Sequence, residues 1–403
     1  MKNFDTHQRC YTPITDHAAL RQTCAQLENE SWLAVDTEFV RVDTYYPELS
    51  LVQIATANRD FYLIDPLALL AEKEHNPGIT QPLMPLMTLL QNPNVLKVFH
   101  SARQDVEVLF QLQHQMPAAL FDTQIAAIFL RHGDLAGFAR VIEAELGISL
   151  DKSQTRTNWH ARPLSAEQIA YAIDDVDYLV RLYQHLTAQL SEAQKQAVLQ
   201  DSAKLLQPEL YQTQPDQAWL KIKGLKRLKP KQLAMVQSLA AWREQHAIEH
   251  NQPKKWTLSD DALLEIVKRP PRTVAALYKV PGIKSSSVRD FGEDWIARID
   301  CVFSAEPESY PQLPPALPEP NPQELALLDA CHAFCQQVSL DYAVPIQNMV
   351  SRDELLCLIR EPHRAPWQGW RHHLLGKPLQ TWLLGQSTLC VQAQRLQFDT
   401  PSR

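Results

Sequence analysis

The chain has 403 residues, of which 45% are hydrophobic and 21% charged, and its formal net charge is −7, so its length predicts two or three folded domains. No stretch approaches about 18 uninterrupted apolar residues and the first ten residues lack an apolar core, so we expect a cytoplasmic protein without a membrane span or signal peptide. The seven cysteines are widely spaced and form no CxxC pair, which argues against a disulfide framework or a structural zinc site.

Three strands are predicted near the start of the chain, in residues 31–37, 49–56 and 60–64. Each is an apolar, β-compatible run, and the turn-forming residues 57–60 separate the second strand from the third. Because the runs are closely spaced, we expect them to form an antiparallel meander.

Helices and one further strand are predicted in the rest of the first 200 residues. The expected helices are residues 82–90, 102–113 and 122–131, and the expected strand is residues 95–99. Ser165 to Gln168 form a capping box, which starts a helix that ends near residue 190. Strands first, followed by alternating strands and helices, predict a layered α/β domain.

Two similar helical segments are predicted beyond residue 200, where the strand signal fades. Seven prolines in residues 306–322 indicate a stiff linker, and the segments on its two sides resemble each other at an offset of 92 residues. The matching pairs are Leu233 and Leu325, Trp242 and Phe334, Pro253 and Pro345, Ser259 and Ser351, and Pro270 and Pro362. We therefore expect two copies of one helical module.

Acidic residues stand at three places where predicted elements begin or end. Asp36 and Glu38 end the first predicted strand, and residues two apart on a strand point to the same face. Two anions held together repel each other unless a cation neutralises them. Asp105 lies near the start of a predicted helix, and Tyr171 and Asp175 share one face of the capped helix. Each acid alone is explained as a solvated charge, but together they supply four acids and one phenol from three elements.

These three segments resemble, in order and spacing, the three motifs of the DEDD exonuclease superfamily. DTEF at 36–39 resembles the first motif, HSARQD at 100–105 the second, and YAIDD at 171–175 the third. The tyrosine four residues before the last acid is typical of the tyrosine subtype, because the histidine subtype needs His where Ala170 stands. The same spacing selects Asp175. The resemblance implies a ribonuclease H-like fold and 3′→5′ hydrolysis.

The whole chain resembles the bacterial ribonuclease D family, and its two helical modules resemble HRDC domains. The resemblance rests on DTEFVR, on LIDP at 63–66, on FDTQ at 121–124 and on residues 150–165. It implies an α/β ribonuclease H-like exonuclease domain followed by two all-α HRDC-type helical domains. The expected boundaries are 1–205 for the exonuclease domain, 213–299 for the first HRDC domain, 300–322 for a Pro-rich linker, and 323–403 for a second, divergent HRDC domain.

The resemblance implies hydrolysis from RNA 3′ ends with release of 5′-nucleoside monophosphates, and trimming of tRNA precursors by a monomer without a membrane partner. It also implies two divalent ions, Mg²⁺ or Mn²⁺, which hard oxygen ligands suit. The implied metal ligands are Asp36, Glu38, Asp105 and Asp175. Tyr171 is implied to orient the attacking water, since a phenol with a pKa near 10 is a poor base at neutral pH.

Three residues close to the motifs have two interpretations each. Phe39 stacks on the terminal base or packs in the core, and His100 contacts substrate or serves the structure. Asp122 is expected to cap the helix that starts at Thr123, with metal contact as the alternative.

A basic loop that also carries an aromatic residue precedes the capped helix. It contains Lys152, Arg156, Trp159 and Arg162. Arg162 is predicted either to clamp a substrate phosphate or to form a structural ion pair.

The middle of the chain predicts a nucleic-acid-binding surface. Residues 216–298 carry 16 Lys and Arg against 9 Asp and Glu, whereas residues 1–200 carry 15 against 24. Six of these cations lie in residues 221–231, which contain no acid. We expect RNA contacts from Lys221, Lys223, Lys226 and Arg227. Residues 280–284 either offer backbone amides to a phosphate or form a tight interhelical turn.

Two other functions fit the same sequence. A DNA-directed 3′→5′ exonuclease is one alternative, because nothing in the motifs separates RNA from DNA. A non-catalytic RNA-binding protein with a decayed nuclease fold is the other, although all five motif residues are present.

Overall fold

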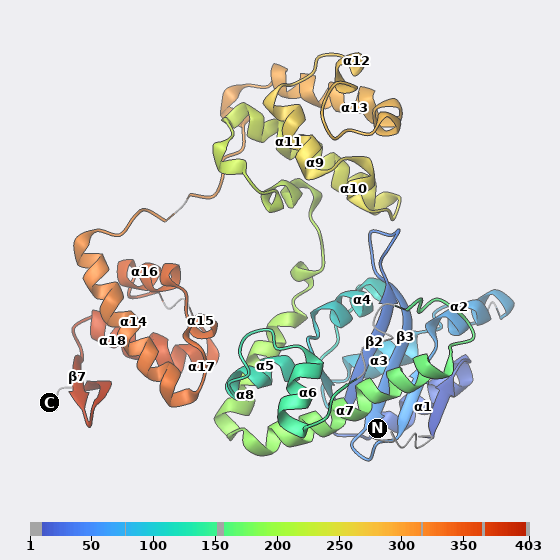
Figure 1. Ribbon diagram of the computed structural model, residues 1–403, viewed down its shortest axis with the longest axis vertical. Helices are drawn as coiled ribbons and strands as arrows, with labels where there is room; N and C mark the ends of the chain where they lie inside the picture. The colour runs from blue at the N-terminus through green and yellow to red at the C-terminus, as the bar shows by residue number, and fades with distance from the viewer. Residues whose placement is uncertain (1–9, 77, 151–156, 316, 365–366, 400–403) are drawn as a thin grey trace. The chain divides into compact units, whose positions relative to one another are not determined.

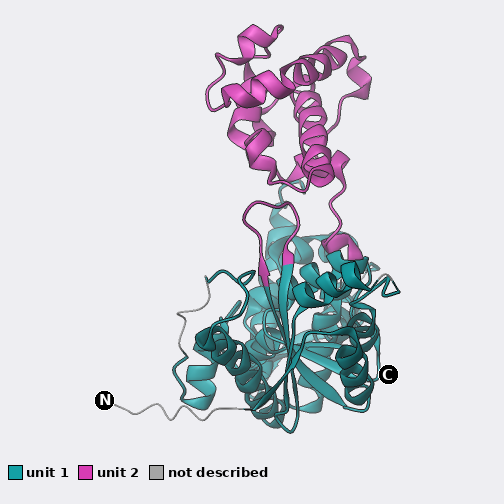
Figure 2. Cartoon of the chain, turned by 90° about the vertical axis from the view of Figure 1, so that its right-hand side faces the viewer, with its two compact units in different colours: residues 1–38, 49–207, 317–403 teal, residues 39–48, 208–316 magenta. Residues whose placement is uncertain are grey.

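The computed structural model describes residues 10–76, 78–150, 157–315, 317–364 and 367–399 (Figure 1). The chain divides into two compact units (Figure 2). Unit 1 contains residues 1–38, 49–207 and 317–403, and unit 2 contains residues 39–48 and 208–316. Among the described residues, no helix has both the length and the apolar character that crossing a membrane requires.

Among the residues that the structure describes, six strands form one mixed sheet, in the order β1-β4-β3-β2-β5-β6. They are β1 (Tyr11–Ile14), β2 (Trp32–Val40), β3 (Glu48–Thr56), β4 (Phe61–Ile64), β5 (Leu96–Phe99) and β6 (Leu120–Asp122). β3 pairs antiparallel with β4, as predicted, whereas β1 pairs parallel with β4 and β5 pairs parallel with both β2 and β6. Because β3 lies inside the sheet, its residues 49–56 are all buried, which explains its nearly continuous apolar sequence.

In the described part of residues 10–207, eight α-helices accompany this sheet. They are α1 (His17–Leu27), α2 (Pro66–His75), α3 (Met84–Gln91), α4 (Arg103–Gln113), α5 (Thr123–Phe129), α6 (Phe138–Leu146), α7 (Ala166–Gln189) and α8 (Glu192–Ala203), followed by the short helix η1 (Lys204–Leu206). The predicted capping box is confirmed: Gln168 N donates to Ser165 Oγ at 3.2 Å, and Ser165 N donates to Gln168 Oε1 at 3.0 Å. Helix α7 therefore begins where the sequence predicts.

Unit 2 contains the first helical module. Its helices are η2 (Pro208–Leu210), η3 (Pro215–Lys221), η4 (Leu225–Arg227), α9 (Pro230–Glu249), α10 (Lys254–Thr257), α11 (Asp260–Lys268), α12 (Val274–Leu277) and α13 (Ser285–Ser304). Trp295 and Leu239 are fully buried in its core. The residues between β2 and β3 also belong to unit 2, where the Tyr45 hydroxyl donates to Glu244 Oε1 at 2.6 Å.

The second helical module belongs to unit 1 and repeats the first one for three helices. Its elements are α14 (Pro322–Tyr342), α15 (Ile346–Met349), α16 (Arg352–Arg360), α17 (Gly369–Arg371), η6 (His372–Gly376), α18 (Lys377–Leu383), β7 (Thr388–Gln392) and β8 (Arg395–Asp399). Helices α14, α15 and α16 start 92 residues after α9, α10 and α11, so the predicted offset is confirmed. The modules diverge after α16, where the described part of the second has no equivalent of the long helix α13.

A β-hairpin ends the described part of the second module, which the sequence predicted to be wholly helical. β7 and β8 pair antiparallel with Thr388 opposite Asp399. The turn between them is Ala393-Gln394, and both residues have positive φ, 50° and 63°. Tight hairpin turns of this kind favour Asn and Gly, so the turn carries no recognisable sequence signal.

The proline-rich segment is held at both ends by the module next to it. Helix α13 extends to Ser304, beyond the expected boundary at residue 299, and η5 (Pro307–Ser309) follows. The Tyr310 hydroxyl then donates to Val302 O at 3.3 Å, and Arg360 Nη2 donates to Pro318 O at 2.9 Å. The part that links the modules is therefore shorter than residues 300–322.

Candidate active site

Strand β2 presents Asp36 and Glu38 on one side of its carboxyl end, as the alternation of strand side chains requires. Both residues are half-buried, whereas Thr37 between them is buried. The Thr37 hydroxyl donates a hydrogen bond to Asp105 Oδ1 at 2.6 Å. Thr37 thereby links the end of β2 to the first turn of α4.

Helix α7 brings a third carboxylate to the end of β2. One possible ligand oxygen each from Asp36, Glu38 and Asp175 lies within 4.8 Å of the other two. Burial and the charge of Asp36 raise the pKa of Asp175 well above its ordinary value, and a hydrogen bond from Tyr171 opposes this rise. The four-residue spacing thus places the phenol beside the carboxylate cluster, as predicted.

Asp105 lies beside this cluster but is not one of the three converging acids. It is 7% exposed in the first turn of α4 and accepts the hydrogen bond from Thr37. Burial raises the pKa of Asp105, and the charge of Asp36 raises it further. Direct metal ligation by Asp105 therefore stays a prediction, although its carboxylate is close enough to Asp36 for the charge of Asp36 to raise its pKa.

Burial and mutual repulsion make the cluster hard to ionise. The pKa of Asp36 is raised by burial to about 6. Burial raises the pKa of Glu38 to about 10, together with the charges of the other three acids. Such a group carries its full negative charge only when a cation neutralises it. The arrangement is that of a cation site built from hard oxygen ligands.

Asp175, and not its neighbour Asp174, joins the cluster. Among the described residues, Asp174 belongs to no group of converging acids, although its charge helps to raise the pKa of Asp175. The geometry agrees with the choice made from the Tyr-x-x-x-Asp spacing.

Helix α7 is anchored to the sheet two residues beyond Asp175. Asp177 is fully buried and accepts hydrogen bonds from Arg59 Nε at 2.5 Å and Arg59 Nη2 at 3.1 Å. Arg59 stands in the β3–β4 turn, with a positive φ of 67°. The sequence gives no sign of this ion pair, because its partners are 118 residues apart.

Asp122 orders the loop that leads to Asp105. It caps α5 by accepting from Gln124 N at 2.8 Å, as predicted. The same carboxylate also accepts from Ser101 N at 2.8 Å and Ala102 N at 2.9 Å, just before α4. This second contact was not predicted. The alternative of metal contact is not favoured, because the carboxylate is occupied by backbone amides.

His100 is held inside the protein through both ring nitrogens. Nδ1 contacts Thr123 Oγ1 at 3.0 Å, and Nε2 contacts Ala136 O at 3.0 Å. Burial lowers the pKa of His100 to about 4, so the ring is neutral at physiological pH. These contacts favour the structural interpretation, and a contact with substrate stays a prediction.

Arg162 forms the structural ion pair that was one of its two interpretations. Its Nε and Nη2 donate to the Asp65 carboxylate at 2.5 and 2.9 Å. The remaining hydrogen bonds go to backbone oxygens of Ser50, Trp159 and Ala161. The guanidinium is therefore engaged within the protein, and phosphate clamping stays a prediction. Lys152 and Arg156 of the same loop lie outside the described residues.

The remaining candidates for substrate contact lie in unit 2. Phe39 follows Glu38 on β2 and is half-buried. Lys221 ends η3, and Lys226 and Arg227 lie in η4. All four predicted cations are exposed: Lys221, Lys223, Lys226 and Arg227. Ile222 and Leu225 between them are buried in the core of the module. Apolar anchors thus hold the basic segment while its cations face solvent.

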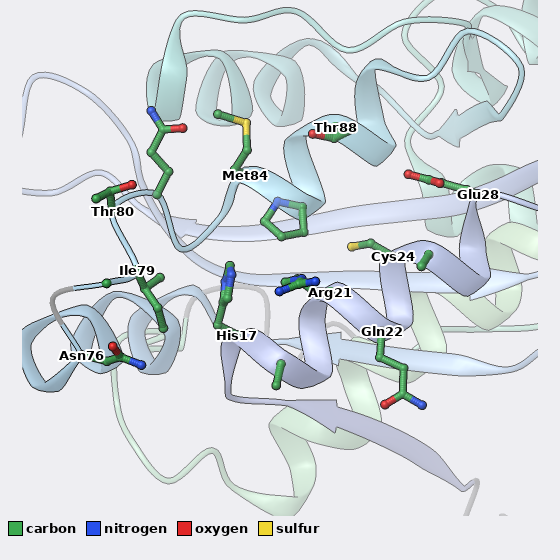
Figure 3. Close-up of a pocket in the computed structure, with 15 residues that line it drawn as sticks. His17, Arg21, Gln22, Cys24, Glu28, Asn76, Ile79, Thr80, Met84 and Thr88 are labelled. Atoms are coloured by element: carbon green, nitrogen blue, oxygen red, sulfur yellow. The ribbon is translucent and has the colours of Figure 1, made fainter.

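The cavity in Figure 3 is separate from the acidic cluster. It has a volume of about 1110 Å³ and lies between α1, α3, Asn76 and residues 78–81. His17 and Arg21 line it, but none of the five motif residues does. The candidate catalytic centre is therefore the acidic cluster at the end of β2, and not this cavity.

Comparison with known proteins agrees with this geometry. A family model described as 3′-5′ exonuclease matches residues 11–191, and one for the HRDC domain matches residues 232–299. Ribonuclease D from Pseudomonas paraeruginosa is 34% identical over 374 residues, which cover 91% of this chain and 96% of the relative. Ribonuclease D from Sphingobium indicum is 33% identical over 391 residues, which cover 96% and 97%.

Solved structures have the same architecture. The crystal structure of Escherichia coli RNase D, described as an exoribonuclease involved in structured RNA processing, matches with a TM-score of 0.78 and 29% identity. The match covers 94% of this chain and 99% of that one. A protein from Bifidobacterium adolescentis shares the fold at 22% identity, with a TM-score of 0.70 over 93% of this chain and 97% of that one.

Proposed function

The chain belongs to the ribonuclease D family and is a 3′→5′ exoribonuclease, and we propose that Asp36, Glu38, Asp105 and Asp175 form its metal-dependent catalytic centre. The observation that carries this proposal is the convergence of three carboxylates within 4.8 Å, at the positions where the family motifs stand. The fold implies a divalent metal, and the donors fit one, because they are hard oxygen ligands whose mutual repulsion a cation relieves.

The number and identity of the metal ions belong to this proposal. Four carboxylates are enough to hold two ions, and Mg²⁺ and Mn²⁺ are the divalent ions that such ligands prefer. When bound, the ions lower the pKa of water and stabilise the negative charge of the leaving oxygen. Asp36, Glu38 and Asp175 supply the converging oxygens, and Asp105 acts from the adjacent turn of α4.

Tyr171 is proposed to orient the attacking water. Its hydroxyl lies at the cluster through its hydrogen bond to Asp175. A phenol with an ordinary pKa near 10 is a weak base at neutral pH, so it positions a water through a hydrogen bond and does not deprotonate it. Phe39 is proposed to stack on the terminal base.

RNA with a free 3′ end is the substrate, and we propose tRNA precursors as the physiological class. The exposed cations Lys221, Lys223, Lys226 and Arg227 support a role of the first HRDC domain in holding structured RNA through its phosphates. The ribonuclease D relatives and the structured-RNA processing described for the Escherichia coli enzyme support the same choice. A cytoplasmic monomer stays the expectation.

The proposed domain boundaries follow the sequence expectations, with two adjustments. The exonuclease domain is proposed to span residues 1–205, and the first HRDC domain to start at residue 213. That domain extends to Ser304, where α13 ends. The second, divergent HRDC domain starts near residue 322, where α14 begins.

A time course on 5′-labelled single-stranded RNA tests the function. The full-length enzyme with Mg²⁺ or Mn²⁺ is expected to give a descending ladder and nucleoside 5′-monophosphates, and chelator is expected to stop the reaction. Intact RNA with both metals would contradict the proposed centre and favour the RNA-binding alternative. Faster degradation of the matching DNA would favour the DNA-directed alternative.

A further inference from the structure

Trp159 is buried against the catalytic tyrosine. It is 2% exposed, and its ring centroid lies 6.0 Å from that of Tyr171 at an interplanar angle of 44°. Its indole Nε1 is also buried, and no described residue supplies a hydrogen-bond partner for it. A buried tryptophan usually satisfies this N–H, so keeping the indole here costs stability. Costs of this kind concentrate at functional sites.

The loop that carries Trp159 is fixed at several points from outside. Arg162 Nη1 donates to Trp159 O at 2.8 Å, while Arg162 Nη2 donates to Ser50 O on β3 at 2.6 Å. The Asp65 carboxylate holds the same guanidinium. The chain on the other side of Trp159 is fixed as well, because Gln168 Nε2 donates to Asn158 O at 3.2 Å. The backbone of Trp159 is thus tied to β3, to the start of α2 and to the start of α7.

We propose that Trp159 is a positioning residue, which holds the Tyr171 ring so that its hydroxyl stays at Asp175, and that Arg162 serves the reaction by fixing Trp159. This inference rests on the proposed role of Tyr171 in orienting water. It assigns the arginine a function through its contacts with Trp159 O and Asp65, not through a substrate phosphate. The indole is suited to the task because it is large and has few rotatable bonds.

A defect in positioning has a specific kinetic signature. Without the indole, the phenol of half-buried Tyr171 gains freedom to leave the hydrogen bond to Asp175. Small displacements of groups that orient reactants cost up to about a hundredfold in rate. RNA binding is expected to stay unaffected, because the Trp159 side chain is buried and presents almost no surface to a ligand. The expected result is therefore a loss of kcat without a change in KM.

A double-mutant cycle on the full-length enzyme tests this. Steady-state hydrolysis of 5′-labelled RNA over a range of RNA concentrations is measured for wild type, Trp159→Leu, Tyr171→Phe and the double variant, with Mn²⁺ present. Trp159→Leu is expected to lower kcat by about ten- to a hundredfold and leave KM unchanged. In the Tyr171→Phe background the same substitution is expected to have little further effect, because the group it positions is gone.

Two further variants separate positioning from loosening of α7. Trp159→Phe keeps an aromatic ring against Tyr171 and is expected to retain most of the wild-type kcat. Trp32→Leu removes an aromatic side chain whose ring centroid lies 4.5 Å from that of Tyr183, on the same helix α7 but three turns away. It is expected to lower the melting temperature without changing kcat.

The outcomes distinguish this inference from the proposed function. An equal loss of kcat from Trp159→Leu in both backgrounds, or the same loss from Trp32→Leu, overturns positioning but leaves the metal centre intact. A Tyr171→Phe enzyme with wild-type rate shows instead that the assigned role of Tyr171 is wrong. When Tyr171→Phe is too slow to measure, the kcat of Trp159→Leu against those of Trp159→Phe and Trp32→Leu decides the question.

Discussion

The four acids at the end of β2 are arranged for function at the expense of stability. Burial raises the pKa of Glu38, Asp105 and Asp175, and the charge of Asp36 raises the pKa of each of them further. A group that is destabilised in the isolated protein but stabilised by a ligand is typical of binding and catalytic sites. The four acids are therefore expected to lower the stability of the protein without metal and to raise it when metal is bound.

The variant Asp36→Asn tests the effect of the cluster on activity and on stability, with and without metal. The variant is expected to lose at least about a hundredfold in hydrolysis, because a bound metal contributes several kcal/mol to the reaction. In chelator, however, it is expected to melt about 2–4 °C higher than wild type, for about 1 kcal/mol of relieved repulsion. Added Mn²⁺ is expected to raise the melting temperature of wild type but not of the variant.

Asp174→Asn is the matched control for this experiment. Asp174 is the neighbour of Asp175 but lies outside the converging group. The control is expected to retain hydrolysis and the stabilisation by Mn²⁺. The metal ligands would be assigned to the wrong residues if Asp36→Asn kept full activity. The same conclusion would follow if Asp174→Asn lost activity while Asp36→Asn did not.

His100 makes stability depend on pH between about 4 and 6.5. Its folded pKa is about 4, against about 6.5 for an unfolded chain. As the pH falls through this window, the unfolded chain binds a proton that the folded chain does not. Stability is therefore lost on acidification, by an amount on the order of 3 kcal/mol.

His100→Gln is expected to weaken this pH dependence while keeping a donor and an acceptor for Thr123 and Ala136. Melting temperatures of both proteins at pH 7 and pH 4.5 provide the measurement. The wild type is expected to lose more stability than the variant between these values. Identical losses of stability in the two proteins would mean that the pKa of His100 is not lowered in the folded protein.

Among the secondary-structure elements, α17 and α8 meet at a glycine. Gly369 has a positive φ of 59°, and a Cβ there would collide with Gln200 Oε1. That same oxygen accepts a hydrogen bond from Trp370 N at 2.9 Å, and Asp201 Oδ2 accepts one from Trp370 Nε1 at 3.1 Å. The second helical module is thus attached to α8 where a side chain has no room.

Gly369→Ala is expected to destabilise this attachment by about 1–2 kcal/mol, through backbone strain and loss of the Gln200 hydrogen bond. The destabilisation is measured by thermal melting and by the rate of limited proteolysis within the second helical module, which begins at Pro322. In a Gln200→Ala background the steric conflict is absent, so the glycine substitution is expected to cost less. Strictly additive effects would contradict a direct conflict between the two side chains.

At the scale of the whole molecule, charge is divided between two functions. The acidic residues that are proposed to hold metal lie in unit 1, while the excess of cations lies in residues 216–298 of unit 2. A net charge of −7 therefore conceals a basic segment suited to RNA. Because phosphate contacts release counterions, binding through this segment falls steeply with salt.

Replacing Lys221, Lys223, Lys226 and Arg227 with Gln is expected to weaken binding to structured RNA and to flatten its salt dependence. The slope of log affinity against log salt decreases by about 0.7–0.9 for each phosphate that the variant no longer neutralises. The rate at saturating RNA is expected to stay unchanged, because the acidic cluster is untouched. Filter binding and single-turnover rates at several salt concentrations measure the two effects.

Lys195 and Arg364 provide a control for this variant, since each is paired with an acid, Glu192 and Glu361 respectively. Replacing both with Gln is expected to leave the affinity and its salt slope close to those of wild type. An equal loss of affinity in the control would mean that the net charge of the protein, and not specific contacts of the basic segment, determines RNA affinity.

Local periodicity was sufficient to predict much of the fold and the outline of the site. Strand alternation places Asp36 and Glu38 together, and helical periodicity places Tyr171 and Asp175 together, whatever surrounds them. The capping box at Ser165 and the 92-residue offset between the helical modules are equally local, and both are confirmed. The hairpin β7–β8 escaped prediction because its Ala-Gln turn lacks the usual residues.

Only the tertiary structure decided how distant residues act. The ion pair of Arg162 depends on Asp65, 97 residues away, and the second contact of Asp122 depends on amides 20 and 21 residues away. The sequence leaves the role of such polar side chains open. Their role depends on which hydrogen-bond partner lies next to them in the folded protein, because a buried polar group needs a partner. The sequence by itself therefore determined the acids and their spacing, and packing determined what holds them in place.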